Sequence, residues 1–524
     1  MPVLPTSRSR FRLTERRQFV GLVLGPLLFL VTGFGLQSSR LSAEASWAAA
    51  TVALMSCWWI TEPVPLWATA CIPILTFPVL SKVSFGITVL QYFDPVNFLF
   101  LGGMWIAACM EQWGLHRRIA LRIVSRIGTS PRRIVLGFML ATGFVSLWIS
   151  NTAAAVMMFP IAMAVIRKFE EQHSRSDELL QKFGLALMLG VAYAASIGGI
   201  GTKIGTGTNL VFVKNSPQPI DFVTWAMMAM PVVLISIPLV WFYLVRIGAR
   251  VPDRDFPGGA EAIREECERL GKMKYGEKVA SAAFLAAAVL WVFRKDIELG
   301  GFTILGWSRL VPWDWKGVIA GTGWSQPLQK IFTDPGDAVV SMVIAGTLFF
   351  IPVRRKIAEE PRFALSVAKA RGVAWGMLVL LGGGFAMAYG IQASGLSEAI
   401  AGNLSHIGKM NLFVATLTVA LISVALTEVA SNTATASILL PILAASAAGF
   451  GLDPLPLMLA VTMSASFGFM LPAGTPPNAI VYSSGYITVP QMARSGLVVD
   501  LFGVVLVAFV CYFLVPWVLG GAAK

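Results

Sequence analysis

Apolar stretches recur along the whole chain, separated by shorter polar segments. They cover residues 19–36, 47–60, 66–80, 222–245, 279–293, 338–351 and 497–518. A helix that spans a membrane needs about 20 mostly apolar residues, and about 17 are enough when flanking side chains reach the interface. The longer stretches meet this requirement and the shorter ones are marginal. We therefore predict an all-α polytopic membrane protein with about 11 transmembrane helices.

One apolar segment is interrupted by a polar triplet, Ser150-Asn151-Thr152. The apolar arms on either side, 134–149 and 153–166, are 16 and 14 residues long, which is short for a full crossing. Arg132 and Arg133 precede the first arm, and Arg167 and Lys168 follow the second. Because both ends carry positive charge, we predict a re-entrant hairpin that enters and leaves on the cytoplasmic side, with the triplet at its tip.

A second Ser-Asn-Thr triplet begins at Ser431, 281 residues after the first. The sixteen residues from Ser150 and the sixteen from Ser431 match at eight positions, and upstream glycines keep the same offset. Farther on, "IGTGTN" (204–209) resembles "AGTPPN" (473–478) at an offset of 269. Counting crossings brings the chain to the second triplet from outside. Two hairpins of opposite orientation, each followed by an interrupted helix, form an inverted repeat typical of secondary transporters.

The charges fit this topology. The chain is 56% hydrophobic and 13% charged, with a net charge of +13. The basic residues cluster at 8–17, 117–133 and 354–371, between apolar stretches, which marks the cytoplasmic side of a membrane protein rather than a nucleic-acid surface. We expect the N-terminus in the cytoplasm, the C-terminus outside, and a bacterial inner membrane as the location. The five cysteines and three histidines are dispersed, so neither disulfides nor a zinc site is predicted.

The four interruptions supply oxygen ligands at membrane depth. Ser, Asn and Thr can cap the half-helices, which is the simpler interpretation. Glycine and proline in 200–209 and 471–478 also leave backbone carbonyls unpaired. Hydroxyl, amide and carbonyl oxygens with little formal charge suit a hard cation such as Na⁺. Two repeat-related interruptions therefore predict two cation sites, and the half-helix N-termini between them favour an anion.

At these motifs the chain resembles the divalent-anion:sodium symporter family. The resemblance rests on "WWITEPVPLWATA" (58–70), both triplets, "TEVASNTAT" (427–435) and "SFGFMLPAGTPPNAIV" (466–481), and it covers nearly the whole chain. It implies a homodimer whose protomers each move a transport domain against a scaffold, like an elevator. The domains implied are scaffold at 1–130, transport at 131–215 and 216–247, a cytoplasmic linker at 248–276, scaffold at 277–405 and transport at 406–524.

The resemblance also implies site residues. The first sodium site would use Ser146, Ser150, Asn151 and Gly205, and the second Thr427, Ala430, Asn432 and Gly474. Ser146 and Thr427 keep the 281-residue offset of the repeat. Substrate carboxylates would meet Asn151, Thr152, Thr206, Asn432, Thr433, Thr475 and Pro476. In the first Gly-Thr loop, Gly201 and Gly205 both fit the ligand position.

Lys203 departs from the family's pattern, which has an uncharged residue in this loop. Its side chain either reaches water from a crevice, or its ammonium group replaces a coupling cation or attracts the dianion. Glu428, which precedes the second triplet, is expected to have a structural role.

The predicted function is sodium-coupled import of C4-dicarboxylates such as succinate, malate or fumarate. Alternatives within transport are a sodium-independent dicarboxylate exchanger, made plausible by Lys203, and sodium-coupled transport of citrate or sulfate. An enzyme is not expected, because the interruptions lack a constellation of His, Cys, Asp and Glu residues. Paired inverted hairpins favour alternating access over an open channel.

Overall fold

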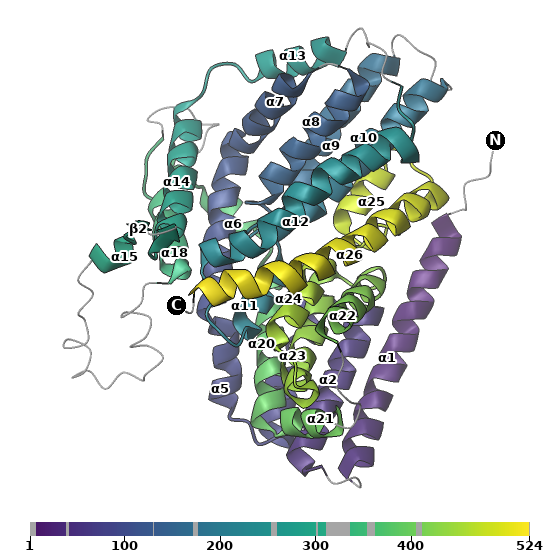
Figure 1. The fold of residues 1–524 in the computed structure, drawn as a ribbon, viewed down its shortest axis with the longest axis vertical. Helices are drawn as coiled ribbons and strands as arrows, with labels where there is room; N and C mark the ends of the chain where they lie inside the picture. The colour runs from purple at the N-terminus through teal and green to yellow at the C-terminus, as the bar shows by residue number, and fades with distance from the viewer. Residues whose placement is uncertain are drawn as a thin grey trace.

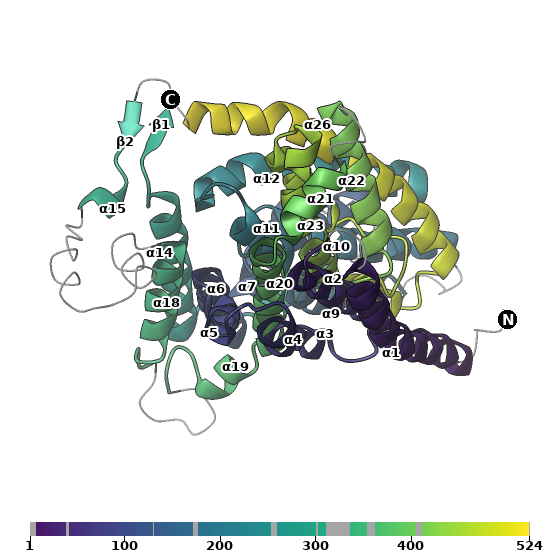
Figure 2. The same cartoon turned by 90° about the horizontal axis from the view of Figure 1, so that it is seen from below.

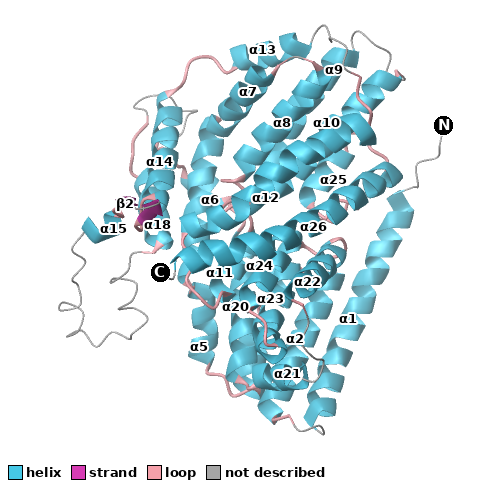
Figure 3. Cartoon of the chain, in the orientation of Figure 1, coloured by secondary structure: helices cyan, strands magenta, loops and turns pink. Residues whose placement is uncertain are grey.

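The computed structural model describes residues 7–37, 41–128, 130–170, 177–252, 259–299, 302–310, 336–353, 362–404 and 411–522. These residues are almost entirely helical (Figure 3). The strands among them are β1 (Ile297–Leu299) and β2 (Phe302–Ile304), which pair antiparallel at the periphery of the molecule (Figure 2). The predicted all-α architecture is confirmed.

Eight helical segments of the described chain are long and apolar enough to cross a membrane: Arg16–Gln37, Phe85–Trp113, Asn151–Glu170, Glu178–Ile200, Phe222–Gly248, Tyr275–Val292, Val367–Ala393 and Val489–Val518. Shorter apolar helices cover Leu66–Leu80, Asp337–Leu348, Leu412–Thr427, Asn432–Ser446 and Pro454–Ser464. Short apolar helices beside long ones are the expected form of a membrane protein with re-entrant and interrupted segments.

The helices of the N-terminal part are α1 (Ser7–Gln37), α2 (Ala43–Thr61), α3 (Leu66–Thr69), α4 (Ile72–Leu80), α5 (Phe85–Leu90), η1 (Gln91–Phe93), α6 (Pro95–Trp113), α7 (Leu115–Ile127), α8 (Pro131–Ser146), α9 (Asn151–Glu170), α10 (Glu178–Ile200), α11 (Gly207–Asn215), α12 (Phe222–Tyr243) and η2 (Leu244–Gly248). The C-terminal part contains α13 (Gly259–Arg269), α14 (Tyr275–Val292), α15 (Trp307–Leu310), α18 (Asp337–Leu348), α19 (Val367–Arg371), α20 (Trp375–Ala393), α21 (Leu396–Leu404), α22 (Leu412–Thr427), α23 (Asn432–Phe450), α24 (Pro454–Ser464), α25 (Pro476–Tyr482) and α26 (Val489–Ala522).

Both triplets lie where two helices meet at a tight turn. In the first half, α8 ends at Ser146 and α9 begins at Asn151, and in the second half α22 ends at Thr427 and α23 begins at Asn432. The serine of each triplet accepts a hydrogen bond from a backbone N–H in the first turn of the following helix, at 3.3 Å and 3.2 Å. The helix breaks occur where they were predicted. The helix after the first triplet is longer than the predicted arm, because α9 continues through Arg167 and Lys168 to Glu170.

Each half also contains one helix broken by a Gly-Thr loop. The pairs are α10 with α11 and α24 with α25, and Thr206 and Thr475 are the N-caps of the second members. One buried asparagine closes each break. The Asn209 amide donates to Gly199 O at 2.9 Å and to Thr202 O at 2.7 Å. The Asn478 amide donates to Gly468 O at 2.9 Å and to Leu471 O at 3.0 Å. These partners keep the 269-residue offset, so the repeat extends to the hydrogen bonds.

The two halves interlock at their interruptions. Helix α11 of the first half packs against α23 of the second, and α25 of the second half packs against α9 of the first (Figure 1). Helix α10 runs through the middle of this assembly and is completely buried over its apolar length. The four interruptions therefore meet in the interior of the protein, at the interface between the repeats.

The predicted linker, 248–276, contacts the basic residues of the 117–133 segment that follows α6. Helix α13 packs against α7 and α9 at the end of the molecule drawn uppermost in Figure 1, and its Glu266 pairs with Arg117 of α7. Arg118 of α7 pairs with Glu277 at the start of α14. Glu266 and Glu277 thus neutralise part of the 117–133 cluster. The predicted linker and this cluster lie on the same side of the protein, as the predicted topology requires.

Candidate functional site

The first triplet belongs to a cluster of three oxygen atoms. Ser146 Oγ lies 2.9 Å from Asn151 Oδ1 and 2.6 Å from Ala195 O of the neighbouring helix α10. The serine is fully buried. One hydroxyl proton cannot satisfy both acceptors, so one of these close oxygen pairs has no proton between its atoms. A cation placed among the three oxygens would remove this repulsion.

Gly199 and Gly205 complete the first cluster. A Cβ on Gly199 would lie 2.2 Å from Asn151 Oδ1, and a Cβ on Gly205 would lie 2.4 Å from Gly199 O. Side chains larger than hydrogen are therefore excluded at both positions. Because the Asn209 amide also holds the Gly199 carbonyl, the Gly-Thr loop is fixed beside the triplet. The sequence leaves Gly201 and Gly205 as alternatives for the sodium-ligand position in this loop. Gly205 is the one that packs against the Gly199 carbonyl.

The second triplet repeats the arrangement. Thr427 Oγ1 lies 2.9 Å from Asn432 Oδ1 and 2.8 Å from the carbonyl oxygen of Ala465, the C-cap of α24. Thr427 is fully buried, and a Cβ on Gly474 would lie 3.4 Å from Gly468 O. Hydroxyl, amide and carbonyl oxygens are hard donors suited to Na⁺, and neither cluster contains a thiolate or an imidazole. The residues present thus fit the two predicted sodium sites.

Two of the predicted sodium ligands stand apart from these side-chain clusters. The Ser150 hydroxyl is exposed and caps α9 through Ala153 N. Ala430 is buried at the second tip, where its N–H bonds Leu426 O at 2.9 Å. Any contribution of these residues comes from the backbone carbonyls at the tips, since their side chains do not join the clusters.

The predicted substrate residues lie at the interface between the halves. A Cβ on Gly207, the first residue of α11, would lie 2.8 Å from Thr433 Oγ1. This contact brings the first Gly-Thr loop, including its half-buried N-cap Thr206, against the second triplet. Thr475 is buried at the N-terminus of α25, and its hydroxyl accepts from Asn478 N at 3.4 Å. Pro476 follows it and is exposed.

A cavity of about 680 Å³ opens beside the first triplet. Its lining includes Ser150 and Thr152 of the triplet, Gly103 of α6 and Met377 of α20. Glu111, His116 and Lys369 also line it, and the Lys369 ammonium pairs with Glu111 at 2.8 Å. The cavity therefore connects the triplet to the predicted cytoplasmic side. A separate pocket, lined by Lys214, Tyr389 and Gln392, contains no triplet residue.

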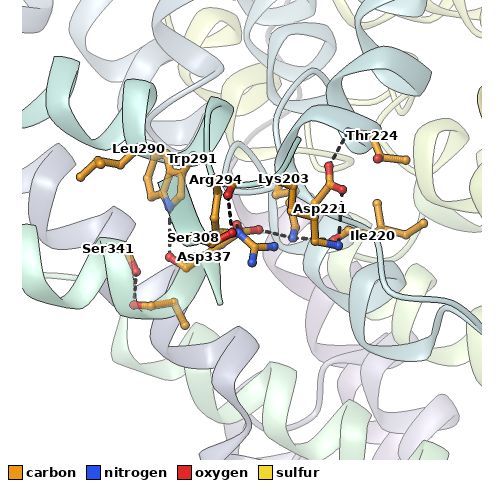
Figure 4. Close-up of polar contacts among 12 residues, drawn as sticks. Lys203, Ile220, Asp221, Thr224, Leu290, Trp291, Arg294, Ser308, Asp337 and Ser341 are labelled. Carbon is orange, nitrogen blue, oxygen red and sulfur yellow. Dashed lines mark hydrogen bonds and ion pairs between the residues drawn. The ribbon is translucent and has the colours of Figure 1, made fainter. Parts of the chain in front are cut away.

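Lys203 does not occupy the first oxygen cluster. It is 4% exposed, and its Nζ donates to Asp337 Oδ2 at 2.6 Å and to Ile220 O at 2.8 Å (Figure 4). Arg294 Nε bonds the other Asp337 oxygen at 2.8 Å. The interpretation that Lys203 reaches water is therefore wrong, because the side chain is buried in an ion pair. Its partner is a carboxylate on α18, so the ammonium group does not take the place of a coupling cation in the triplet site.

Sequence reasoning did not identify several groups of this site. The carbonyl of Ala195 belongs to α10 and that of Ala465 to the C-cap of α24, and no sequence pattern distinguishes either alanine from its apolar neighbours. Asn209 and Asn478 were within the matched motifs and keep the repeat offset, so the repeat could have revealed them. Asp337 lies 134 residues from Lys203, and only the fold brings the two together.

Comparison with known proteins agrees with the motifs. The family model described as the sodium:sulfate symporter transmembrane region matches residues 16–519. A protein from Staphylococcus saprophyticus, named sodium-dependent dicarboxylate transporter SdcS, is 39% identical over 510 residues, which cover 96% of this chain and 92% of the relative. The SdcS protein of Staphylococcus aureus strain RF122 is 36% identical over 509 residues, with the same coverage. On this sequence similarity over almost its full length, the chain belongs to the sodium:sulfate symporter family, the divalent-anion:sodium symporters that its motifs resemble.

Proposed function

We propose that this protein is a sodium-coupled symporter that imports C4-dicarboxylates such as succinate, malate or fumarate. The observation that carries the proposal is the pair of matching oxygen clusters around Ser146 and Thr427. In each cluster a hydroxyl oxygen lies 2.6–2.9 Å from an amide oxygen and from a backbone carbonyl oxygen. Two sites of this kind bind two sodium ions.

Charge balance couples these ions to the substrate. The substrate region between the clusters consists of Thr152, Thr206, Thr433 and Thr475, and these residues carry no charge. The Lys203 ammonium is already engaged by Asp337. A dicarboxylate in this interior needs compensating positive charge. Two sodium ions supply it and make binding of the dianion depend on sodium.

The relatives support the choice of dicarboxylate. Both SdcS proteins are named sodium-dependent dicarboxylate transporters. The description of the family model names sulfate, which is also a dianion, so we keep sulfate as an alternative substrate. Hydroxyl and amide groups of the triplets, with the N-terminus of α11 and the Thr475 hydroxyl, suit two carboxylates presented from opposite ends of a short substrate.

The cavity indicates which side the described conformation faces. It connects Ser150 and Thr152 with Lys369, on the side of the basic loops, whereas the opposite pocket contains no triplet residue. We infer an inward-facing state. In this state the substrate can leave to the cytoplasm. Transport then requires the triplets to move relative to α6 and α20, as in an elevator-type mechanism.

Among the described residues, three ion pairs join the 131–247 part of the proposed transport domain to the proposed scaffold. They are Lys203 with Asp337, Lys214 with Asp94, and Lys295 with Asp221 (Figure 4 draws the first). An elevator movement must break or exchange these pairs, so they stabilise the inward-facing state. We further propose that the protein works as a homodimer in a bacterial inner membrane, with a cytoplasmic N-terminus.

The test is uptake of labelled succinate into proteoliposomes, measured with and without an inward Na⁺ gradient and with and without internal succinate. Sodium-driven accumulation into vesicles without internal substrate supports the symporter. Uptake that requires internal succinate and ignores sodium would establish an exchanger instead. Competition by malate, fumarate, citrate and sulfate in the same vesicles identifies the substrate class, and stronger competition by citrate or sulfate would overturn the choice of C4-dicarboxylates.

A further inference from the structure

The motif at 58–70 has no part in the two oxygen clusters. It begins in the last turn of α2, where it fastens α1 to α2. Trp58 Nε1 donates to Gly21 O at 3.0 Å, and a Cβ on Gly21 would overlap Thr61 Oγ1. Helix α1 packs along α2. The first residues of the motif therefore fix the position of α1.

Glu62, the next residue of the motif, has an unusual backbone conformation. It is the C-cap of α2, with φ 51° and ψ 46°. Residues with a Cβ are uncommon in this left-handed region, and they persist there where surrounding contacts hold them, often at functional positions. The Glu62 carbonyl accepts from Gln18 Nε2 at 3.0 Å, and its Oε2 lies 3.3 Å from Arg17 Nη2. Two neighbouring residues of α1 thus hold Glu62 in place.

The guanidinium group of Arg17 has a second partner. Its Nη1 donates to Val429 O at 3.2 Å. Val429 lies between Thr427 and Ala430, in the tight turn from α22 to α23. Carbonyl groups at the end of a helix lack partners within that helix, and an arginine beside them supplies a donor and a favourable charge. One guanidinium therefore bridges Glu62 of the proposed scaffold and the tip of the second hairpin.

The corresponding tip of the first half is held by aromatic rings. The offset of 281 relates Val429 to Trp148, whose ring lies edge-on to Phe284 of α14 with the centroids 4.8 Å apart. Each tip thus contacts the first spanning helix of the opposite half. The contact of the second tip is a directed, charge-assisted hydrogen bond, so a small displacement of the tip breaks it.

We propose that Arg17, oriented by Glu62, is a positioning residue that latches the second hairpin in the inward-facing state. The bond can form only while the tip lies beside the cytoplasmic end of α1. Movement of the transport domain toward the outside must therefore break it. This inference rests on the proposed function, since it assigns a scaffold residue to the elevator movement of the site around Thr427. Loss of the latch should favour the outward-facing state without changing the oxygen ligands.

A cysteine at position 437 reports the outward-facing state. The offset of 281 relates Val156, which lines the cavity, to Ser437, which is buried beside Gly384 of α20. Because the repeat is inverted, Ser437 should face the outside when the transport domain has moved. In a background without the five native cysteines, the rate at which an external, membrane-impermeant thiol reagent modifies Ser437→Cys measures the outward-facing population.

The test adds further changes to the Ser437→Cys protein. Arg17→Met keeps a long side chain but cannot donate, so the external labelling rate should rise by about 2- to 10-fold, the value of one hydrogen bond. Glu62→Gln leaves Arg17 in place without its carboxylate partner and should give a smaller rise. Arg16→Met removes the same charge from the adjacent, exposed residue; it is the control and should keep the original rate.

Side-specific labelling separates a latch from a structural role. Faster labelling from the cytoplasmic side as well would mean that the protein has loosened, and would overturn the proposal. An unchanged external rate in Arg17→Met, an equal rise in Arg16→Met, or a cysteine at 437 that the external reagent never reaches would also overturn it. Wild-type vesicles without sodium-dependent uptake would contradict the proposed function instead, because the labelling rates need no transported substrate.

Discussion

At the scale of single residues, Lys203 shows how the fold decides the role of a charge. Its ammonium group lies against Asp337 and Ile220 O, away from the oxygens around Ser146. The Lys203→Leu variant should therefore keep the sodium dependence of uptake nearly unchanged. Asp337 keeps Arg294 as a partner in this variant, at 2.8 Å. The measurement is the initial rate of uptake against external Na⁺ for both proteins, and a large shift in sodium affinity would contradict this placement.

The Asp337→Leu variant is the matched comparison. It removes the carboxylate that Lys203 and Arg294 share, and breaking a buried ion pair from one side costs about 3–5 kcal/mol. We expect a much lower unfolding temperature in detergent for Asp337→Leu than for Lys203→Leu. Equal losses in the two variants would show that the ion pair contributes little to stability.

At the scale of the elements, the two broken helices depend on Asn209 and Asn478. Each amide bonds carbonyls that the break has released, and both side chains are fully buried. Asn209→Ala and Asn478→Ala should each destabilise the protein by about 2–4 kcal/mol, the sum of two or three buried hydrogen bonds. Thermal unfolding in detergent measures the effect.

Asn215→Ala is the control for the helix breaks. Asn215 makes one hydrogen bond, to Val211 O at 2.8 Å, at the end of α11, so its loss should cost about 1 kcal/mol. Variants at Asn209 and Asn478 that are as stable as Asn215→Ala would show that the breaks are held by packing alone.

The sequence allowed the elements to be predicted better than their contacts. Apolar arms, triplets and glycines placed both hairpins and both broken helices, because a membrane permits irregular backbone at few places. The offset of 281 alone pairs Ser146 with Thr427. The ion pair of Lys203 with Asp337 was not predictable, since it joins distant segments through helix packing. The length of α9 was underestimated because its basic residues continue the helix.

At the scale of the whole molecule, the position of the cavity predicts from which side of the membrane the first triplet is accessible. Val156 lines the cavity below the first triplet and is 54% exposed. In a background without the five native cysteines, Val156→Cys should react with a membrane-impermeant thiol reagent added from the cytoplasmic side. Gln392→Cys, in the opposite pocket, should react from outside. Labelling of Val156→Cys from outside alone would reverse the inferred orientation.

The repeat makes a stronger claim about the whole protein: the two halves each contribute one sodium site of the same design. Asn151 and Asn432 supply the amide oxygens of these sites, each 2.9 Å from the hydroxyl of its cluster. The direct measurement is equilibrium binding of radioactive Na⁺ to purified wild type, Asn151→Ala and Asn432→Ala.

Loss of one amide ligand is worth about 1.5–3 kcal/mol, or about 10- to 150-fold in affinity. Each variant should therefore bind one sodium ion fewer than wild type at concentrations that saturate the remaining sites, and both should stay folded. Wild-type ion counts and affinities in both variants would contradict the assignment of the triplets as sodium sites.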